Sequence, residues 1–319
     1  MVRQALLTTV ACVLVWATTT LALEIASKPR QTLERPEGEV FSVAFSADGK
    51  YVCAGGERGV VYCWDANSGE VANRITAHLR AAVFSVVAYP LAPFAVHASE
   101  LGIKFHLIGG HGRVPSFPFK HMQTVLALDF SSDGNHMASG DRGGETIVWD
   151  LWTGEPYRRF QPAKAPVNSL RYHPDGTRLA VATNDGNVRL YDTKADKLLY
   201  EVAAHEGECN SVAFTGDGRW FASAGKDRKI RIWNTEGGRA VATLEGHEDA
   251  VNTVVVQPKG ARLLLSASDD RTVRLWNLDT RKSVQTIPHQ NAVYGLAWSS
   301  DGRMVATGAG KVVQLFEVK

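Results

Sequence analysis

Short apolar runs recur along most of the chain, with polar turns between them. Runs such as SVAFS, ALDFS and GLAWS precede Asp-Gly turns, and second runs such as HMASG and WFASAG follow. Alternation of apolar and polar residues is typical of strands with one buried face. Asp-Gly between two such runs predicts a hairpin, because the turn needs a positive φ that Gly adopts without steric cost. The pattern therefore predicts an all-β chain of short antiparallel strands.

The strand pattern itself repeats. The turn residues Asp133, Asp175 and Asp217 follow one another at steps of 42 residues, and Asp48 precedes Asp133 by 85, about twice that step. In a second register, third runs end in aromatic residues at Trp64, Trp149, Tyr191, Trp233, Trp276 and Phe316. The missing member falls at GIKFHL, with His106 in the aromatic position, so the chain has seven repeats. Because one repeat cannot bury its own faces, such units stack against one another.

The blocks GHEDAVNTV, RLLLSASDDRTVRLWNL and FASAGKDRKIRIWN resemble the WD-repeat family, and the resemblance extends over residues 28 to 319. It implies a seven-bladed β-propeller of four-stranded antiparallel blades, forming a single domain over residues 23–319. The last repeat stops at its third strand, and residues 28 to 36 match the fourth-strand segments at 197 to 205 and 239 to 247. We therefore expect this N-terminal strand to pair with the C-terminal blade and close the ring.

Residues 4 to 23 carry no charge and follow Arg3, which is the order of a secretory signal: a basic start, an apolar middle and small residues at the end. Residues 1–22 are predicted to be a signal peptide cleaved after Ala22, which places the protein outside the cytoplasm, in a periplasmic or extracellular location. An uncleaved membrane anchor over residues 4–23 is the main alternative, since the run is near the length that spans a bilayer. A buried first strand is the third interpretation.

Histidines recur at the start of repeats, at His78, His121, His205, His247 and His289. The family resemblance implies that they belong to buried hydrogen-bond networks with a turn Asp, a strand Ser or Thr and the strand-ending Trp. The best matches are His205, Ser223, Asp227 and Trp233 in one repeat, and His247, Ser266 or Ser268, Asp270 and Trp276 in the next. A structural role is favoured, because a group satisfied inside a blade is not free to transfer protons.

Three repeats depart from this pattern and are expected to rely mostly on apolar packing. The first has Pro36 and Arg58 at the matching positions, the third has Gly143 in place of the Asp, and the fourth has Ala163 in place of the His. The second repeat departs most, with Pro-rich turns and His97, His106, His111 and His121 on different strands. Loop decoration is favoured over a metal site there, because metal ligands need convergent spacings.

The function most consistent with the sequence is a non-catalytic scaffold that docks protein or peptide partners on the propeller rim. Carried over from the family, the candidate partner-binding positions are Glu57, Arg142, Asn184, Lys226 and Asp269. A net charge of +2 makes nucleic acid an unlikely partner. No catalytic, cofactor or metal motif is found, and a monomer without cofactor is expected. The alternative is a secreted propeller enzyme, a hydrolase, lyase or oxidoreductase, that uses the central channel.

Cys53 and Cys63 flank a turn centred near Arg58, and a hairpin there sets them directly opposite each other. Opposed strand residues lie close enough for a disulfide. Two unbonded cysteines acting as small hydrophobes are nevertheless favoured, because a one-residue change of register separates the pair. Cys209 is expected to be a reduced core residue.

Overall fold

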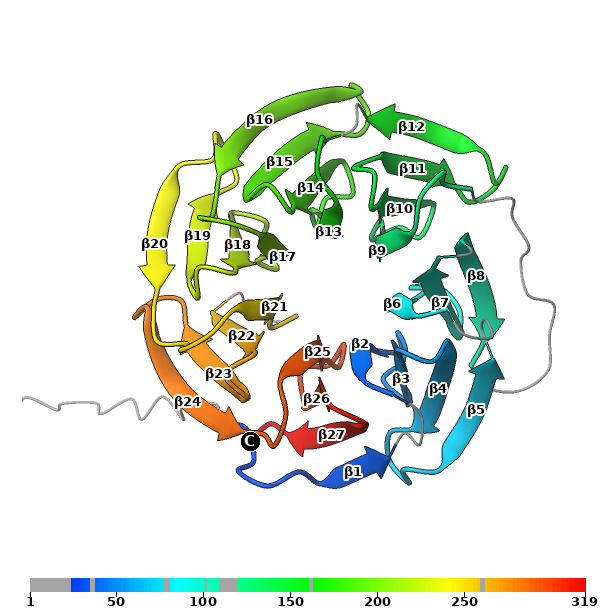
Figure 1. Cartoon of the computed structure of the whole chain (residues 1–319), viewed down its shortest axis with the longest axis vertical. Helices are drawn as coiled ribbons and strands as arrows, with labels where there is room; N and C mark the ends of the chain where they lie inside the picture. Colours follow the sequence, from blue (N-terminus) through cyan, green and yellow to red (C-terminus); the bar gives the residue numbers. More distant parts are fainter. Residues whose placement is uncertain are drawn as a thin grey trace, which may run out of the picture.

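The computed structural model describes residues 24–34, 38–76, 81–100, 102–108, 120–160, 163–258 and 262–319. The proposed signal peptide, Pro36, His78, His111 and the Gly/Pro-rich stretch 109–118 lie outside these residues, so the predictions on them stay predictions. The described part of the chain forms antiparallel sheets arranged radially around a central channel, with neighbouring sheets in chain order (Figure 1). The predicted seven-bladed propeller is confirmed.

Blades one to six follow the chain from the channel outward, and blade seven does so for its first three strands. Blade one contains β2 (Val40–Phe45), β3 (Tyr51–Gly56), β4 (Val60–Asp65) and β5 (Val71–Thr76). Blade two contains β6 (Val83–Ala88), β7 (Phe94–Ser99) and β8 (Gly102–Leu107). Blade three contains β9 (Val125–Phe130), β10 (His136–Asp141), β11 (Thr146–Asp150) and β12 (Pro156–Phe160). Blade two thus has three strands among the described residues, and the segment for a fourth falls outside them.

Blades four to seven, which form the second half of the ring, each have four described strands. Blade four contains β13 (Val167–Tyr172), β14 (Arg178–Thr183), β15 (Asn187–Asp192) and β16 (Lys197–Ala203). Blade five contains β17 (Cys209–Phe214), β18 (Trp220–Gly225), β19 (Ile230–Asn234) and β20 (Ala240–Leu244). Blade six contains β21 (Val251–Val256), β22 (Leu263–Ser268), β23 (Thr272–Asn277) and β24 (Lys282–Pro288). Blade seven contains β25 (Val293–Trp298), β26 (Met304–Ala309), β27 (Val312–Glu317) and the N-terminal β1 (Gln31–Glu34).

The hydrophobic core lies between blades. Each of the seven buried clusters combines residues of two neighbouring sheets, so that every junction in the ring has its own cluster. Neighbouring blades approach closely at glycines near the ends of second strands: a Cβ on Gly140 would lie 2.3 Å from the Val167 side chain of the next blade. Such a separation is too short for any side chain at that position, so glycine lets blades three and four meet.

The ring closes through its N-terminal strand, as predicted. Leu33 in β1 is opposite Val313 in β27 and is buried against the core between blades seven and one. Upstream, Ile25 forms an isolated bridge with Val318, and the side chain of Gln285 in β24 both accepts from the Ile25 amide (2.9 Å) and donates to its carbonyl (2.7 Å). Closure therefore extends beyond residues 28 to 36 and includes a clasp from blade six.

Cys53 in β3 and Cys63 in β4 are directly opposite, in the predicted register, and form a disulfide. The favoured interpretation of two unbonded cysteines is therefore wrong. The register holds because the β3–β4 turn spans Glu57 to Gly59, and both cysteines are buried in the core between blades one and two. Cys209 is buried and free, as expected.

Candidate functional site

The two faces of the propeller are distinguished by their turns. We call the face with the turns between second and third strands the upper face, and the face with the Asp-Gly turns between first and second strands the lower face. The five candidate partner-binding residues occupy one equivalent upper position. Each backbone amide donates to the carbonyl of the residue just before its blade's first strand, at 2.8 to 3.0 Å: Glu57 to Glu39, Arg142 to Thr124, Asn184 to Pro166, Lys226 to Glu208 and Asp269 to Ala250.

These five side chains differ in their solvent exposure and in whether another side chain already pairs with them. Glu57, Arg142 and Lys226 are exposed, whereas Asn184 and Asp269 are half-buried. Lys226 pairs with Glu208 (3.2 Å). Within the described structure, the guanidinium of Arg142 makes no hydrogen bond or ion pair. Arg142 is thus the candidate most available to a partner, and Asn184 and Asp269 serve partly to hold the channel wall.

A ring of seven side chains lines the upper mouth of the channel, and the sequence analysis missed it. Each is the second residue of a first strand, and together they surround a cavity of about 310 Å³. The ring contains Phe41, Phe84, Leu126, Asn168, Asn210, Asn252 and Tyr294. This position was detectable from the repeat, since it follows the apolar residue that opens every first strand.

One side of the mouth is apolar and largely aromatic. Phe41 stacks on Phe84 with ring centroids 6.2 Å apart, and Tyr294 meets Phe41 edge-on at 6.1 Å. Leu126 continues the apolar arc in blade three. These side chains are only partly buried. The arc therefore offers an apolar contact surface to a group that enters the mouth.

The other side of the mouth consists of amides. The side-chain NH₂ of Asn168 donates to the Cys209 carbonyl (3.1 Å), and Asn210 and Asn252 do the same to Val251 and Val293 in the next blades (3.0 and 3.1 Å). Asn168 and Asn252 also donate to the rim residues Asn184 (3.3 Å) and Asp269 (2.7 Å). Their own carbonyl oxygens accept no hydrogen bond from the described residues, so they remain available to a donor on a ligand.

The predicted histidine networks are brought together inside their blades. His205 Nδ1 lies 2.8 Å from Asp227 and its Nε2 2.8 Å from Ser223 Oγ, which accepts from Trp233 Nε1 at 2.9 Å. In blade six, His247, Asp270, Ser266 and Trp276 repeat the arrangement at 2.7 to 2.8 Å. Ser266 takes the serine role, while Ser268 bonds the backbone of Asp249 and Asp270.

Blade three has the same network, which contradicts the expectation that it relies on apolar packing. His121 bonds Asp141 (3.0 Å) and Ser139 (2.7 Å), and Trp149 donates to Ser139 (2.7 Å). Gly143 supplies no carboxylate, but Asp141 stands two residues earlier at the end of β10 and reaches the same imidazole nitrogen. Blade four also has a polar substitute, in which Thr183, Asp185 and Glu201 hold Arg189.

Burial lowers the pKa of His121, His205, His247 and His289, even though a carboxylate opposes the shift in the first three. The imidazoles are therefore neutral near pH 7, with both ring nitrogens engaged in hydrogen bonds. This arrangement fixes the register of a blade and leaves no free lone pair for proton transfer.

Comparison with known families agrees with the fold. Residues 166–319 match the model described as the IFT122 first beta-propeller, and residues 27–65 and 114–150 match the WD domain, G-beta repeat. The chain belongs to the WD-repeat β-propeller family.

Two curated proteins of Schizosaccharomyces pombe are similar to this WD-repeat propeller. The Target of rapamycin complex subunit wat1 is 29% identical over 112 residues, which is 35% of either chain. Meiotic fizzy-related protein 1 is 22% identical over 135 residues, which is 42% of this chain and 32% of that protein. The alignments span about a third of the length of these relatives.

One group in this WD-repeat propeller has the composition of a metal site. Ligand atoms of His121, Asp141 and Glu145 lie within 4.8 Å of one another. Both nitrogens of His121 are already engaged, and Glu145 pairs with Arg159 at 2.6 Å. The hydrogen bonds and the Arg159 counter-charge account for the group as the blade-three network with an added ion pair.

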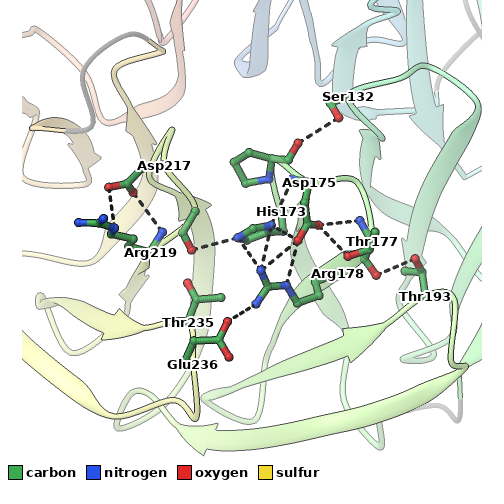
Figure 2. Close-up of polar contacts among 12 residues, drawn as sticks. Ser132, His173, Asp175, Thr177, Arg178, Thr193, Asp217, Arg219, Thr235 and Glu236 are labelled. Carbon is green, nitrogen blue, oxygen red and sulfur yellow. Dashed lines mark hydrogen bonds and ion pairs between the residues drawn. The ribbon is translucent and has the colours of Figure 1, made fainter.

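A polar cluster on the lower face joins blades four and five and was also missed from sequence. His173 Nε2 lies 3.0 Å from the Gly218 carbonyl, and Arg178 contacts both Asp175 (3.0 Å) and Glu236 (2.8 Å), as Figure 2 shows. The His173–Gly218 and Arg178–Glu236 contacts cross from blade four to blade five, which favours a structural role for the cluster.

The described part of the chain contains no helix with the length and apolar character needed to span a membrane.

Proposed function

We propose that this WD-repeat propeller is a non-catalytic scaffold that binds protein or peptide partners on its upper face. The observation that carries the proposal is the divided mouth: an aromatic and apolar arc opposite three asparagine amides, around a cavity of about 310 Å³. Such a surface suits a peptide segment that inserts an apolar side chain against Phe41 and Phe84 and donates backbone hydrogen bonds to the amide side.

The rim adds charge around this mouth. The exposed Glu57 and Arg142 have opposite signs, which suits a mixed polar partner better than a phosphate backbone. The relative wat1 is named as a subunit of a complex, in agreement with a docking role. Apart from the Tyr294 phenol, the seven mouth residues include no acid, base or imidazole, which supports binding over the alternative of an enzyme working at the upper mouth.

Affinity capture with matched variants tests the proposal. Partners recovered from the source organism with wild-type protein should be lost with Phe84→Ser and weakened with Arg142→Glu. The control is Arg219→Glu, because Arg219 is a lower-face side chain that is 82% exposed. Thermal unfolding of each variant establishes that it is folded. Identical partners with wild type and both upper-face variants would show that docking does not use this face.

We also propose that the protein is exported, with residues 1–22 as a cleaved signal peptide; an anchor over residues 4–23 is the alternative. The Cys53–Cys63 disulfide supports export, because such bonds persist in oxidising compartments. N-terminal sequencing of protein from the native host should find Leu23 first. Intact Met1 in a soluble cytoplasmic fraction would contradict the proposal.

A further inference from the structure

A second ring of equivalent residues lines the channel deeper than the mouth. Each is the fifth residue of a first strand, and five of the seven are small and apolar. The ring contains Ala44, Val87, Asp129, Arg171, Ala213, Val255 and Ala297. The two charged members, Asp129 in β9 and Arg171 in β13, are neighbours of opposite sign in an otherwise uncharged ring. All seven line a cavity of about 470 Å³ towards the lower face, and Arg171 also borders the upper cavity.

Asp129 and Arg171 do not satisfy each other. The closest approach, between Arg171 Nη1 and Asp129 Oδ1, is 4.0 Å, which is longer than a hydrogen bond. Nη1 donates to the Leu170 carbonyl (3.2 Å), and Asp129 Oδ2 accepts from the Tyr172 amide (2.7 Å). Among the described residues, the other guanidinium donors make no hydrogen bond, and the Asp129 carboxylate accepts one further hydrogen bond, from the Phe130 backbone. Both side chains reach the channel, with 35% and 23% of their surface exposed for Arg171 and Asp129 respectively.

The other charged side chains near the lower opening lie on its turns and not in the lining of the cavity. Asp48, Asp133, Asp217 and Asp301 are all on lower turns, and none of them lines the cavity. Asp129 and Arg171 therefore form the charged feature that faces the cavity itself. A ligand of one sign would satisfy one of them and face the like charge of the other, whereas a ligand carrying both signs satisfies both.

We propose that the lower channel binds a small zwitterion with an ammonium group beside a carboxylate, as in a free α-amino acid with an apolar side chain. Its carboxylate binds the open donors of Arg171, its ammonium group binds Asp129 Oδ1, and its side chain packs on the Ala and Val members of the ring. The cavity volume lies within the range of small-molecule sites, roughly 300 to 1,000 Å³. This proposal does not rest on partner docking on the upper face, although Arg171 borders both cavities.

Ligand-observed NMR on the full chain tests the proposal with alanine, valine, leucine and phenylalanine, each added alone at millimolar concentration. We expect saturable binding of at least one. For that amino acid, the N-acetyl derivative lacks the ammonium group and the amide derivative lacks the carboxylate. Each should bind about tenfold more weakly or worse, since a hydrogen bond to a charged group is lost.

Substitutions of the two charged residues test whether the amino acid binds in the lower channel. Arg171→Gln and Asp129→Asn should each abolish saturable binding, Arg171→Lys should weaken it, and the lower-face control Arg219→Gln should leave it unchanged. Upper-face partner capture by Asp129→Asn should also be unchanged, so failure of this site is distinguishable from failure of the docking proposal. Absence of binding by all four amino acids overturns the proposal, and so does equal binding of the N-acetyl derivative. These two outcomes are measured on wild-type protein and do not depend on a variant folding.

Discussion

Single residues of this propeller differ widely in how much they contribute to the free energy of unfolding. We expect the contribution to be large where a side chain is buried and takes part in a hydrogen-bond network. Trp276 is 1% exposed, and its indole donates to Ser266, so its side chain fills space between blades and satisfies a buried hydroxyl. Trp152 is 85% exposed on a turn after β11. The two tryptophans have the same chemistry but opposite surroundings.

Trp276→Ala and Trp233→Ala should each lower the free energy of unfolding by about 3 to 5 kcal/mol, because a large buried side chain leaves a cavity. Trp152→Ala should lower it much less. Urea midpoints of the three variants provide the comparison. A larger loss for Trp152→Ala than for either buried tryptophan would mean that the repeat register is wrong.

For single residues, the sequence predicts contacts that follow the repeat pattern and misses contacts that depart from it. The networks of blades five and six are readable because His205 and His247 stand at the expected spacing from their Ser and Trp partners. Asp141 is not readable in this way, because its carboxylate reaches His121 from a position that aligns with Gly225 in blade five rather than with the turn Asp227. The Cys53–Cys63 bond depends on a one-residue register that local patterning leaves open.

The short strand β1 closes the ring. Four residues complete blade seven, bury Leu33 and precede the junction with blade one. The sequence predicts this strand because the last repeat lacks its fourth run and residues 28 to 36 match fourth strands elsewhere. It does not predict the Gln285 clasp on Ile25, which joins residues 260 positions apart and follows only from the closed ring.

Deleting residues 28 to 36 should lower the melting temperature of the whole propeller, because β27 is left as an open edge and Leu33 no longer covers the core. Removing residues 1–22 should leave the melting temperature unchanged. Differential scanning calorimetry on both truncated proteins measures the effect. An unchanged melting temperature for the 28 to 36 deletion would show that closure does not depend on this strand.

For the whole molecule, neutral buried histidines couple stability to pH. The pKa of His121, His205, His247 and His289 is lowered by burial from the ordinary 6.5. Between pH 6.5 and those lower values, the unfolded chain binds more protons than the folded one, so acidification favours unfolding. The stability that the neutral imidazoles give to the folded protein is therefore fully present above about pH 7. It is lost progressively as the pH falls below about 6.5.

Urea midpoints should therefore be level between about pH 7 and 8 and fall steadily towards about pH 5. His289→Gln should make the fall shallower, because one titrating imidazole is removed. His136→Gln serves as the comparison, since His136 is only half-buried and lies outside the His–Ser–Trp networks. A midpoint that rises on acidification would contradict the assignment of neutral buried histidines.

The contacts that close the ring also fix where the two ends of the described chain lie. This position sets the direction of the aromatic mouth when the protein is attached through either end. Glu24 and Lys319 exchange backbone hydrogen bonds of 3.0 and 2.7 Å, beside the end of β27 on the lower face. Both residues therefore lie on the side opposite the aromatic mouth. A tether at this point directs the mouth outward from the supporting surface, so that incoming partners do not compete with the tether for space.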